Sequence, residues 1–382
     1  MAVQRRASRA RILAHFGAGP QEIAELLAYN ENPFDHGRLP YPIHLPLPPE
    51  PHVAAWEGYA AEAAERGVFA TLARRLPQLR FPIREGISQT EAYRAVTRRG
   101  RSPDEFAEAT GLSLQAPDAL RLVVHQSATG PIPVLVTGPR ADFVTLVQAL
   151  SKRNEPWPVP LSMGASLVQG FNNWDRIRAY RRRWEAEDPA HRDDAAWAWE
   201  FERLVPRREL YEDRFIILSS GPYSNVAAAE LGLPEETWQQ LSLRIRIEHE
   251  CVHYFTARMF GVARNNVFDE VLADYLGIVA AAGHYRRDWA LRFLGLEAFP
   301  VYREGGRLQN YRGDPPLSDA AFVVLQALTR AAIDHLARYD AARFPRATSP
   351  AERGPTLLAL TRLTLEEMAS PEFPALVDAG LR

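Results

Sequence analysis

From Pro234 to Gly261 the sequence is typical of one long helix, and the rest of the chain has to be arranged around it. Proline suits the first turn of a helix and disrupts its interior, and no proline lies between residue 235 and Phe260. Glycine enters the left-handed conformation without strain, so Gly261 predicts the end of the helix. We therefore expect a single helix over this range.

This predicted helix carries the residues His249-Glu250-Cys251-Val252-His253, the pattern H-E-x-x-H. Side chains four residues apart lie on one face of a helix, so both imidazoles can reach one metal ion. Glu250 lies about 100° around the helix from His249, beside such an ion, where it can accept a proton from bound water. The pattern arises by chance in on the order of one per cent of chains of this length. The surrounding sequence must therefore decide whether it marks a metal site.

A second helix is expected from about Val267 to Ala282, directly after the first. Asn266 suits its N-cap, with Asp269 three residues later in a capping-box-like relation. Such a helix would run antiparallel to the first one. Glu270 and Asp274 are four residues apart and share a face, so Glu270 can ligate a metal while Asp274 accepts the N–H of a ligating histidine.

Together these residues resemble the gluzincins, the thermolysin-like zinc metallopeptidases, over about residues 240–280. The family pattern is H-E-x-x-H followed by a helix with E-x-x-x-D. The resemblance implies hydrolysis of a peptide bond in a peptide or protein substrate by a water activated on one zinc ion per chain. It implies that the three zinc ligands are His249, His253 and Glu270. Glu250 would be the general base, and Asp274 would orient one of the ligands.

Thermolysin-like enzymes also supply a tyrosine or histidine donor to the oxyanion from downstream segments. The candidates here are Tyr302, Tyr311 and His335, and a packing or surface role is the alternative for each. No G-A-M-E-N-type motif is present, which argues against a standard aminopeptidase.

A short apolar strand is expected at Arg214–Leu218, ahead of the metal helix. In zincins an edge strand in this position pairs with the substrate backbone. The alternative is a plain core strand that ends in a turn. The candidate substrate-binding residues at this strand are Ser219, Gly221, Tyr223 and Asn225.

The remaining patterns predict a mainly helical α+β protein. A β-hairpin is expected at 119–138, where apolar residues alternate on either side of Ser127–Gly130. The proline-rich stretch 31–52 cannot form regular helix or a central strand, and the proline-rich stretch 155–164 is expected to be a linker or cleft-edge segment. Further helices are expected at 1–30, 53–76, 88–99, 142–152, 173–186, 194–204, 318–341 and 355–370.

The resemblance implies a zincin-like core, in which a small sheet lies over the antiparallel active-site and ligand helices. We expect three regions along the chain. These are an N-terminal α/β region with the proline-rich segment and hairpin at 1–155, the catalytic region at 156–300, and a helical C-terminal region at 301–382.

Composition indicates a globular chain, since 46% of its 382 residues are hydrophobic and 24% are charged. The net charge of −2 carries no long single-sign block, so we expect no nucleic-acid partner. Cys251 is the single cysteine, so no intrachain disulfide can form. We see neither an apolar signal segment nor an apolar run of membrane-spanning length, and therefore expect a cytoplasmic protein without membrane contact. Oligomeric state is left open.

Three alternatives to a metallopeptidase remain at this stage. One is a zinc hydrolase that acts on a small-molecule amide, which an enclosed pocket would favour. Another is a non-catalytic binding or regulatory protein on a zincin scaffold. The last is a helix pair whose polar residues form a buried hydrogen-bond network without any metal.

Overall fold

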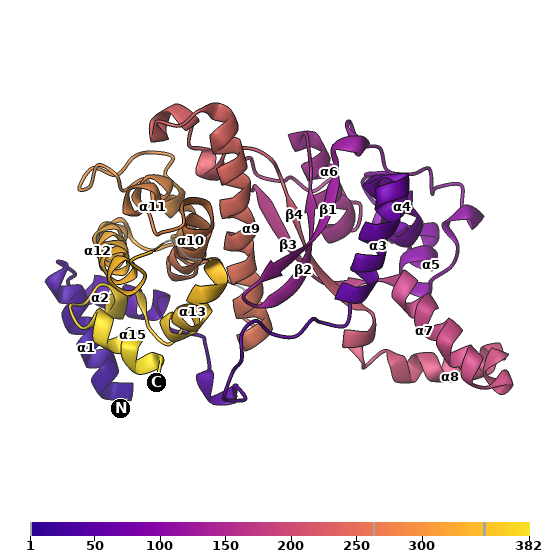
Figure 1. Cartoon of the computed structure of the whole chain (residues 1–382), viewed down its shortest axis with the longest axis horizontal. Helices are drawn as coiled ribbons and strands as arrows, with labels where there is room; N and C mark the ends of the chain where they lie inside the picture. The colour runs from indigo at the N-terminus through magenta and orange to yellow at the C-terminus, as the bar shows by residue number, and fades with distance from the viewer. Residues whose placement is uncertain (1, 263, 347–348) are drawn as a thin grey trace. The chain divides into compact units, whose positions relative to one another are not determined.

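The computed structural model describes residues 2–262, 264–346 and 349–382, and Figure 1 labels its elements. It is mainly helical with one four-stranded sheet, so the predicted α+β class is confirmed. The chain divides into two compact units. Unit 1 comprises Met1–Leu47, Ser127–Thr129 and Gly221–Arg382, and unit 2 comprises Pro48–Gln126 and Gly130–Ser220.

The sheet belongs to unit 2 and has the strand order β1-β2-β4-β3. The strands are β1 (Arg121–Ser127), β2 (Gly130–Val136), β3 (Ala165–Asn172) and β4 (Glu212–Leu218). β1 and β2 are neighbours, as the predicted hairpin requires. β4 pairs with β2 in parallel and with β3 antiparallel, so the sheet is mixed. No strand was predicted at β3, because its alternation of apolar and polar residues is short and directly follows a proline-rich stretch.

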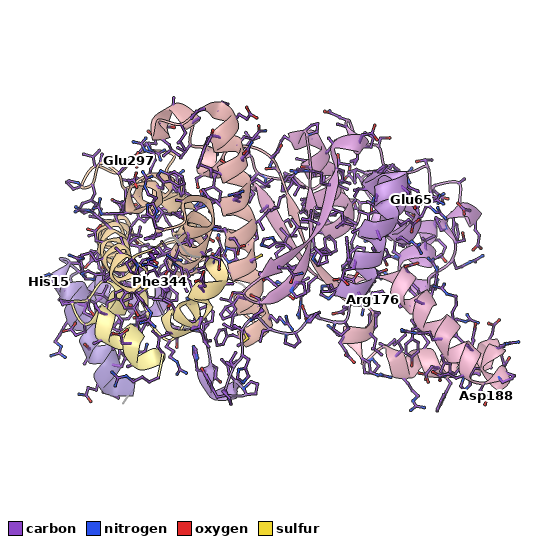
Figure 2. The ribbon with its side chains drawn as sticks, viewed as in Figure 1. His15, Glu65, Arg176, Asp188, Glu297 and Phe344 are labelled. Atoms are coloured by element: carbon purple, nitrogen blue, oxygen red, sulfur yellow. The ribbon has the colours of Figure 1, made fainter. Side chains whose placement is uncertain are left out.

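The helices of unit 2 pack against this sheet through large apolar side chains. Phe143 of α6 and Trp56 of α3 share one core cluster with Phe215 of β4. At its edge the buried Asp213 accepts hydrogen bonds from Trp56 Nε1 at 2.8 Å and from Arg176, labelled in Figure 2, at 2.6 Å. The helices are α3 (Val53–Arg66), α4 (Val68–Arg75), α5 (Glu91–Arg99), α6 (Arg140–Ser151), α7 (Trp174–Glu187) and α8 (Asp194–Leu204).

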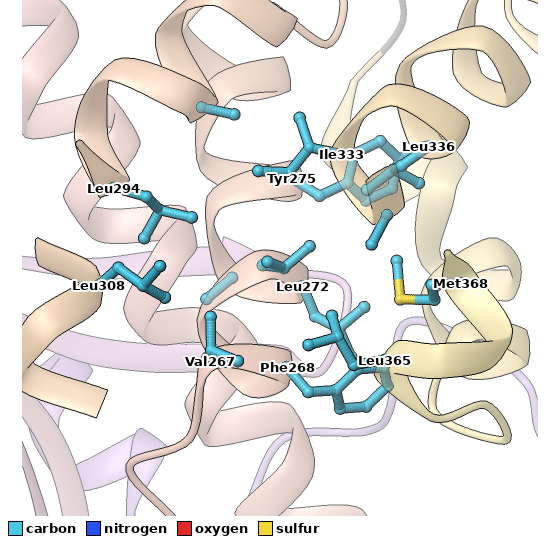
Figure 3. Close-up of a cluster of buried hydrophobic side chains, with 14 of the residues drawn as sticks. Val267, Phe268, Leu272, Tyr275, Leu294, Leu308, Ile333, Leu336, Leu365 and Met368 are labelled. Carbon is cyan, nitrogen blue, oxygen red and sulfur yellow. The ribbon is translucent and has the colours of Figure 1, made fainter. Parts of the chain in front are cut away.

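Unit 1 is built from helices gathered around α10. Figure 3 shows Leu272 and Tyr275 of α10 among Ile333 and Leu336 of α12 and Met368 of α14. The helices are α1 (Ala2–His15), α2 (Pro20–Tyr29), α9 (Glu235–Phe260), α10 (Val267–Ala282), α11 (Arg287–Leu294), α12 (Asp319–Arg343), α13 (Gly354–Leu360), α14 (Leu365–Met368) and α15 (Phe373–Gly380).

Three of the predicted helices are wrong in extent. The helix expected at 53–76 is divided into α3 and α4 at Gly67, which adopts a φ of +81°. The helix expected at 1–30 is broken between α1 and α2, where Gly17 adopts a φ of +87°. The helix expected at 355–370 is divided into α13 and α14, because Thr364 caps a new helix by accepting the backbone N–H of Glu367. α11 and α15 were not predicted.

α9 and α10 have the ends that the sequence predicts. Gly261 closes α9 in the left-handed conformation, with a φ of 68°. The Asn266 side chain caps α10 by accepting the N–H of Phe268 at 3.0 Å. Asp269, expected to complete a capping box, instead pairs with Arg264 at 2.7 Å. The end of α9 and the start of α10 therefore lie where the sequence predicts them.

α12 is the one described helix that is long and apolar enough to cross a membrane, with a mean hydropathy of 1.2 over its best window. Within unit 1, 56% of that window is buried, and residues such as Leu325 and Leu328 lie in the core. A buried helix of a folded core has the same length and composition.

Candidate metal centre

α9 and α10 lie antiparallel and very close together. Gly277 makes this possible, because a Cβ atom there would lie 2.7 Å from the carbonyl oxygen of Ile245. One turn further along α9, His249 lies opposite Asp274, and one turn beyond that His253 lies opposite Glu270. The antiparallel pairing thus brings four polar side chains from two helices into one place.

Three of these side chains converge on a common point. His249 Nε2 and His253 Nε2 are 3.1 Å apart. Each also lies 3.4 Å from an oxygen of the Glu270 carboxylate. Ligands at about 2.05 Å from a tetrahedral zinc ion are about 3.3 Å from one another. The three donors therefore already have the spacing that a zinc ion would impose, and their two nitrogens and one oxygen are a donor set that zinc accepts.

The charges of this cluster are strongly coupled. Burial alone would raise the pKa of Glu270, but His249 and His253 hold it well below its ordinary value. Burial lowers the pKa of His249, whereas Glu270 and Asp274 outweigh that effect and raise it to about 9. Glu270 is thus an anion at neutral pH, the form in which a carboxylate binds a cation.

The far side of His249 contacts a hydrogen-bond network. Tyr223 Oη lies 2.7 Å from His249 Nδ1 and 2.6 Å from Asp274 Oδ1. Arg307 donates to Tyr223 Oη at 2.7 Å and also to Asp274 Oδ2. An ionised carboxylate only accepts, so the Tyr223 proton points at Asp274, and the near neighbours of His249 Nδ1 are both acceptors. His249 therefore carries a proton on Nδ1, so the proton that a metal ion would displace is the one on Nε2, the nitrogen that faces His253 and Glu270.

Glu270 is held from its other side by Tyr311. The Tyr311 hydroxyl donates to Glu270 Oε2 at 2.7 Å. The backbone carbonyl of Tyr311 in turn accepts a hydrogen bond from Tyr29 Oη at 2.5 Å, and Tyr29 Oη accepts one from Val267 N at 3.1 Å. Tyr29 therefore joins the first residue of α10 to the segment that carries Tyr311.

Residues 11–372 match the sequence model of a family of unknown function, DUF7005. The chain belongs to this family. No curated protein and no solved structure matches the chain. The geometry of the DUF7005 protein itself must therefore carry any argument about its function.

In this DUF7005 protein the expected ligand residues and Asp274 lie together. Glu250 is half-buried on α9 beside His249, and its charge contributes to raising the pKa of His253, though less than Glu270 does. Of the three expected oxyanion donors, only Tyr311 touches the cluster, through Glu270. Tyr302 instead donates to the Gly306 carbonyl at 2.6 Å, and His335 Nδ1 lies 3.0 Å from the Met368 carbonyl.

The expectation of a substrate-pairing edge strand is wrong for β4. β4 lies between β2 and β3, so both of its edges are already hydrogen-bonded, as in a plain core strand. After it, Ser219 N donates to the Gly164 carbonyl within unit 2. The Gly221 carbonyl accepts from Arg246 of α9, and Asn225 ends a short 3₁₀ turn, η8 (Tyr223–Asn225). Of these residues, Tyr223 alone contacts the cluster, where it meets a histidine.

Sequence reasoning missed Arg307 and Tyr29 and gave Tyr223 another role. Arg307 begins the 3₁₀ helix η10 (Arg307–Tyr311) inside an irregular stretch without periodicity. One signal was available, the pair Gly305-Gly306. A Cβ atom on Gly306 would lie 2.6 Å from the Gly295 Cα, so glycine permits the close approach just before Arg307.

Proposed function

We propose that this protein is a zinc-dependent hydrolase of the gluzincin type that cleaves an amide bond in a peptide or protein. The observation that carries the proposal is the triangle of His249 Nε2, His253 Nε2 and the Glu270 carboxylate, with sides of 3.1, 3.4 and 3.4 Å. The presence of Glu250 next to His249 supports catalysis, because a site that only binds metal has no need of a base there.

A zinc ion bound by these residues would lower the pKa of a coordinated water towards neutral and polarise the substrate carbonyl. Glu250 then accepts a proton from the attacking water and later delivers it to the leaving amine nitrogen. Asp274, with Tyr223 and Arg307 behind it, keeps His249 in the tautomer that a metal ligand requires. Tyr311 keeps Glu270 in place.

The zincin-like core is part of the same proposal. Two features support it: a small mixed sheet precedes the metal helix along the chain, and an antiparallel pair of helices supplies the ligands. The coarse description, a mainly helical α+β chain, does not depend on it.

The test compares wild type with Glu250→Gln for zinc content and for hydrolysis of unfolded casein and of small acyl anilides. We expect about one zinc per chain in both and a loss of activity of about 10²–10⁴-fold in Glu250→Gln, the range for removal of a general base. Glu236→Gln, which alters an exposed carboxylate on the same helix, is the control and should keep full activity. Equal activity in wild type and Glu250→Gln would refute catalysis.

Substrate size separates the proposal from the alternative of a small-amide hydrolase. Cleavage of casein by wild type supports a peptidase, whereas turnover of anilides alone identifies the alternative. In both cases Glu270→Ala and His253→Ala should lose the metal, since each removes one of three protein ligands. Normal zinc content in Glu270→Ala would refute the ligand assignment.

A further inference from the structure

The strand β3 forms one edge of the sheet in unit 2, and its outer side has no neighbouring strand among the described residues. A groove of about 820 Å³ runs along this edge. Leu167–Asn172 of β3 line it on one side, and Tyr93, Thr97 and Arg98 of α5 with the end of α6 line it on the other. An open strand edge offers alternating N–H and C=O groups to an extended chain.

A bulge limits how much of this edge another chain can use. The pairing of β3 with β4 is interrupted between Val168 and Phe171, and Gly170 there has a φ of +67°. Bulges of this kind stop edge-to-edge pairing of whole sheets. The edge is therefore suited to a short extended peptide rather than to the sheet of a second copy.

The groove is positively charged. Arg98 and Arg153 are exposed along it, and its lining contains neither aspartate nor glutamate. In the part of the chain that the structure describes, neither arginine forms an ion pair within 4.0 Å. Both guanidinium groups lie near the buried Tyr93, where their charges act against the burial that raises its pKa. Two unpaired cations beside one strand edge attract an acidic ligand.

An exposed tryptophan adjoins the groove. Ser151 and Arg153 also line a second hollow of about 620 Å³, together with Lys152 and Trp157. Trp157 is 61% exposed, which is unusual for so large an aromatic side chain. Two carboxylates also line this hollow: Glu85, which is exposed, and Glu155, which already accepts the backbone N–H groups of Gly86 and Ser88, each at 2.8 Å. We call the two adjoining hollows the β3 groove.

We propose that the β3 groove binds an extended acidic peptide segment, which adds to β3 as a further strand. Its carboxylates would lie against Arg98 and Arg153 and an apolar side chain against Trp157. A nucleic acid matches the cations and the tryptophan, but its backbone lacks the N–H donors that would pair with strand carbonyls. The proposal concerns unit 2 alone, so it stands or fails independently of the metal centre in unit 1.

The test begins with a random dodecapeptide library selected on the full-length chain carrying Glu250→Gln, which prevents cleavage of the peptides. We expect enrichment of peptides rich in aspartate and glutamate. Failure to enrich any peptide, or enrichment of peptides without acidic residues, would overturn the proposal.

The most enriched peptide, labelled with fluorescein, is then titrated against two charge-matched double variants. Arg98→Glu with Arg153→Glu should weaken binding by about tenfold or more, since both charge contacts become repulsive. Arg121→Glu with Arg182→Glu, which reverses two exposed charges outside the groove, should change the affinity by less than about twofold. Equal losses in the two variants would show nonspecific attraction and contradict the proposal.

Strand addition is tested by N-methylation of alternate residues of the same peptide. Methylation on the edge that pairs with β3 should abolish binding, while methylation on the opposite edge should leave it unchanged. If neither methylation pattern reduced the affinity, strand addition would be excluded. If a 12-nucleotide single-stranded DNA bound more tightly than any peptide, the groove would be assigned to nucleic acid instead.

A carbodiimide cross-link locates the bound peptide independently. Lys152 is the single lysine of the chain, so it provides the only side-chain ammonium group, next to Arg153. An amide bond between Lys152 and a peptide carboxylate, identified by mass spectrometry, is the expected product. Cross-linking confined to the N-terminal amine would place the peptide elsewhere and contradict the proposal.

Discussion

At the scale of single residues, Arg307 has the clearest role that the sequence did not reveal. Asp274 is buried, and a buried carboxylate costs several kcal/mol unless it is paired and hydrogen-bonded. Burial raises its pKa, but Arg307 and His249 together bring that pKa below its ordinary value. Arg307 also donates to Tyr223. Removing Arg307 would therefore loosen the two groups that hold the tautomer of His249.

We predict that Arg307→Met weakens zinc binding by about 10–100-fold, the usual effect of losing a partner behind a metal ligand. Competition with a fluorescent zinc chelator measures this. Arg286→Met, which removes a surface arginine paired with Asp288, serves as the control and should bind zinc as wild type does. Unchanged zinc affinity in Arg307→Met would show that the hydrogen bonds of Arg307 to Tyr223 and Asp274 do not contribute to metal binding.

The sequence predicted the contacts that follow from helix periodicity and missed those that depend on loops. His249 with His253, and Glu270 with Asp274, are four residues apart, so a shared face followed at once. These two faces meet if the second helix runs antiparallel to the first, which the short connection between them predicts. Arg307 begins η10 and Tyr29 ends α2, and both are far from the ligand residues in the sequence, so no local pattern encodes their approach to the site.

At the scale of elements, the site depends on the separation of α9 and α10. At Gly277 the backbone of α10 approaches the Ile245 carbonyl of α9 so closely that a Cβ atom would lie 2.7 Å from it. We predict that Gly277→Ala forces them apart, destabilises the protein by about 1–3 kcal/mol and weakens zinc binding. Urea unfolding and zinc titration measure the two effects.

The matched control is Gly58→Ala in α3, where a Cβ atom would meet nothing within 4 Å. There the better helix propensity of alanine should stabilise the protein by up to about 1 kcal/mol. If Gly277→Ala proved as harmless as Gly58→Ala, close packing would not be what positions the ligands.

Element prediction succeeded where capping chemistry is local and failed where neighbours decide. Gly261 and Asn266 mark the ends of α9 and α10 by their own conformational preferences. β3 carries no such signal, because its pairing with β4 across a bulge comes from residues far along the chain. The edge position considered for β4 was wrong for the same reason, because the sequence of one strand does not determine its place in the sheet.

At the scale of the whole molecule, the two compact units are discontinuous in sequence. The first 47 residues belong with the C-terminal part of the chain, which places Tyr29 in the same unit as α9 and α10. The composition does not change along the chain in a way that predicts this division into units. The proposed metal site and the proposed peptide-binding groove therefore belong to different units, and each unit should respond separately to its own ligand.

We predict that removing zinc with a chelator lowers the amide-exchange protection of α9 and α10 and leaves that of α6 and β2 unchanged. A ligand present at about a hundredfold above its Kd stabilises the unit that binds it by about 3 kcal/mol. Hydrogen exchange with mass spectrometry resolves the segments. Equal loss of protection in both units would show that the metal does not act through unit 1 alone.

The coordination shell of the zinc ion decides the central claim most directly. X-ray absorption at the zinc edge of the purified chain should show nitrogen and oxygen ligands at about 2.0–2.1 Å, two of them with the outer scattering of imidazole, and no sulfur. A sulfur ligand at about 2.3 Å, which only Cys251 or one of the four methionines could supply, would contradict it, as would a chain that binds no zinc.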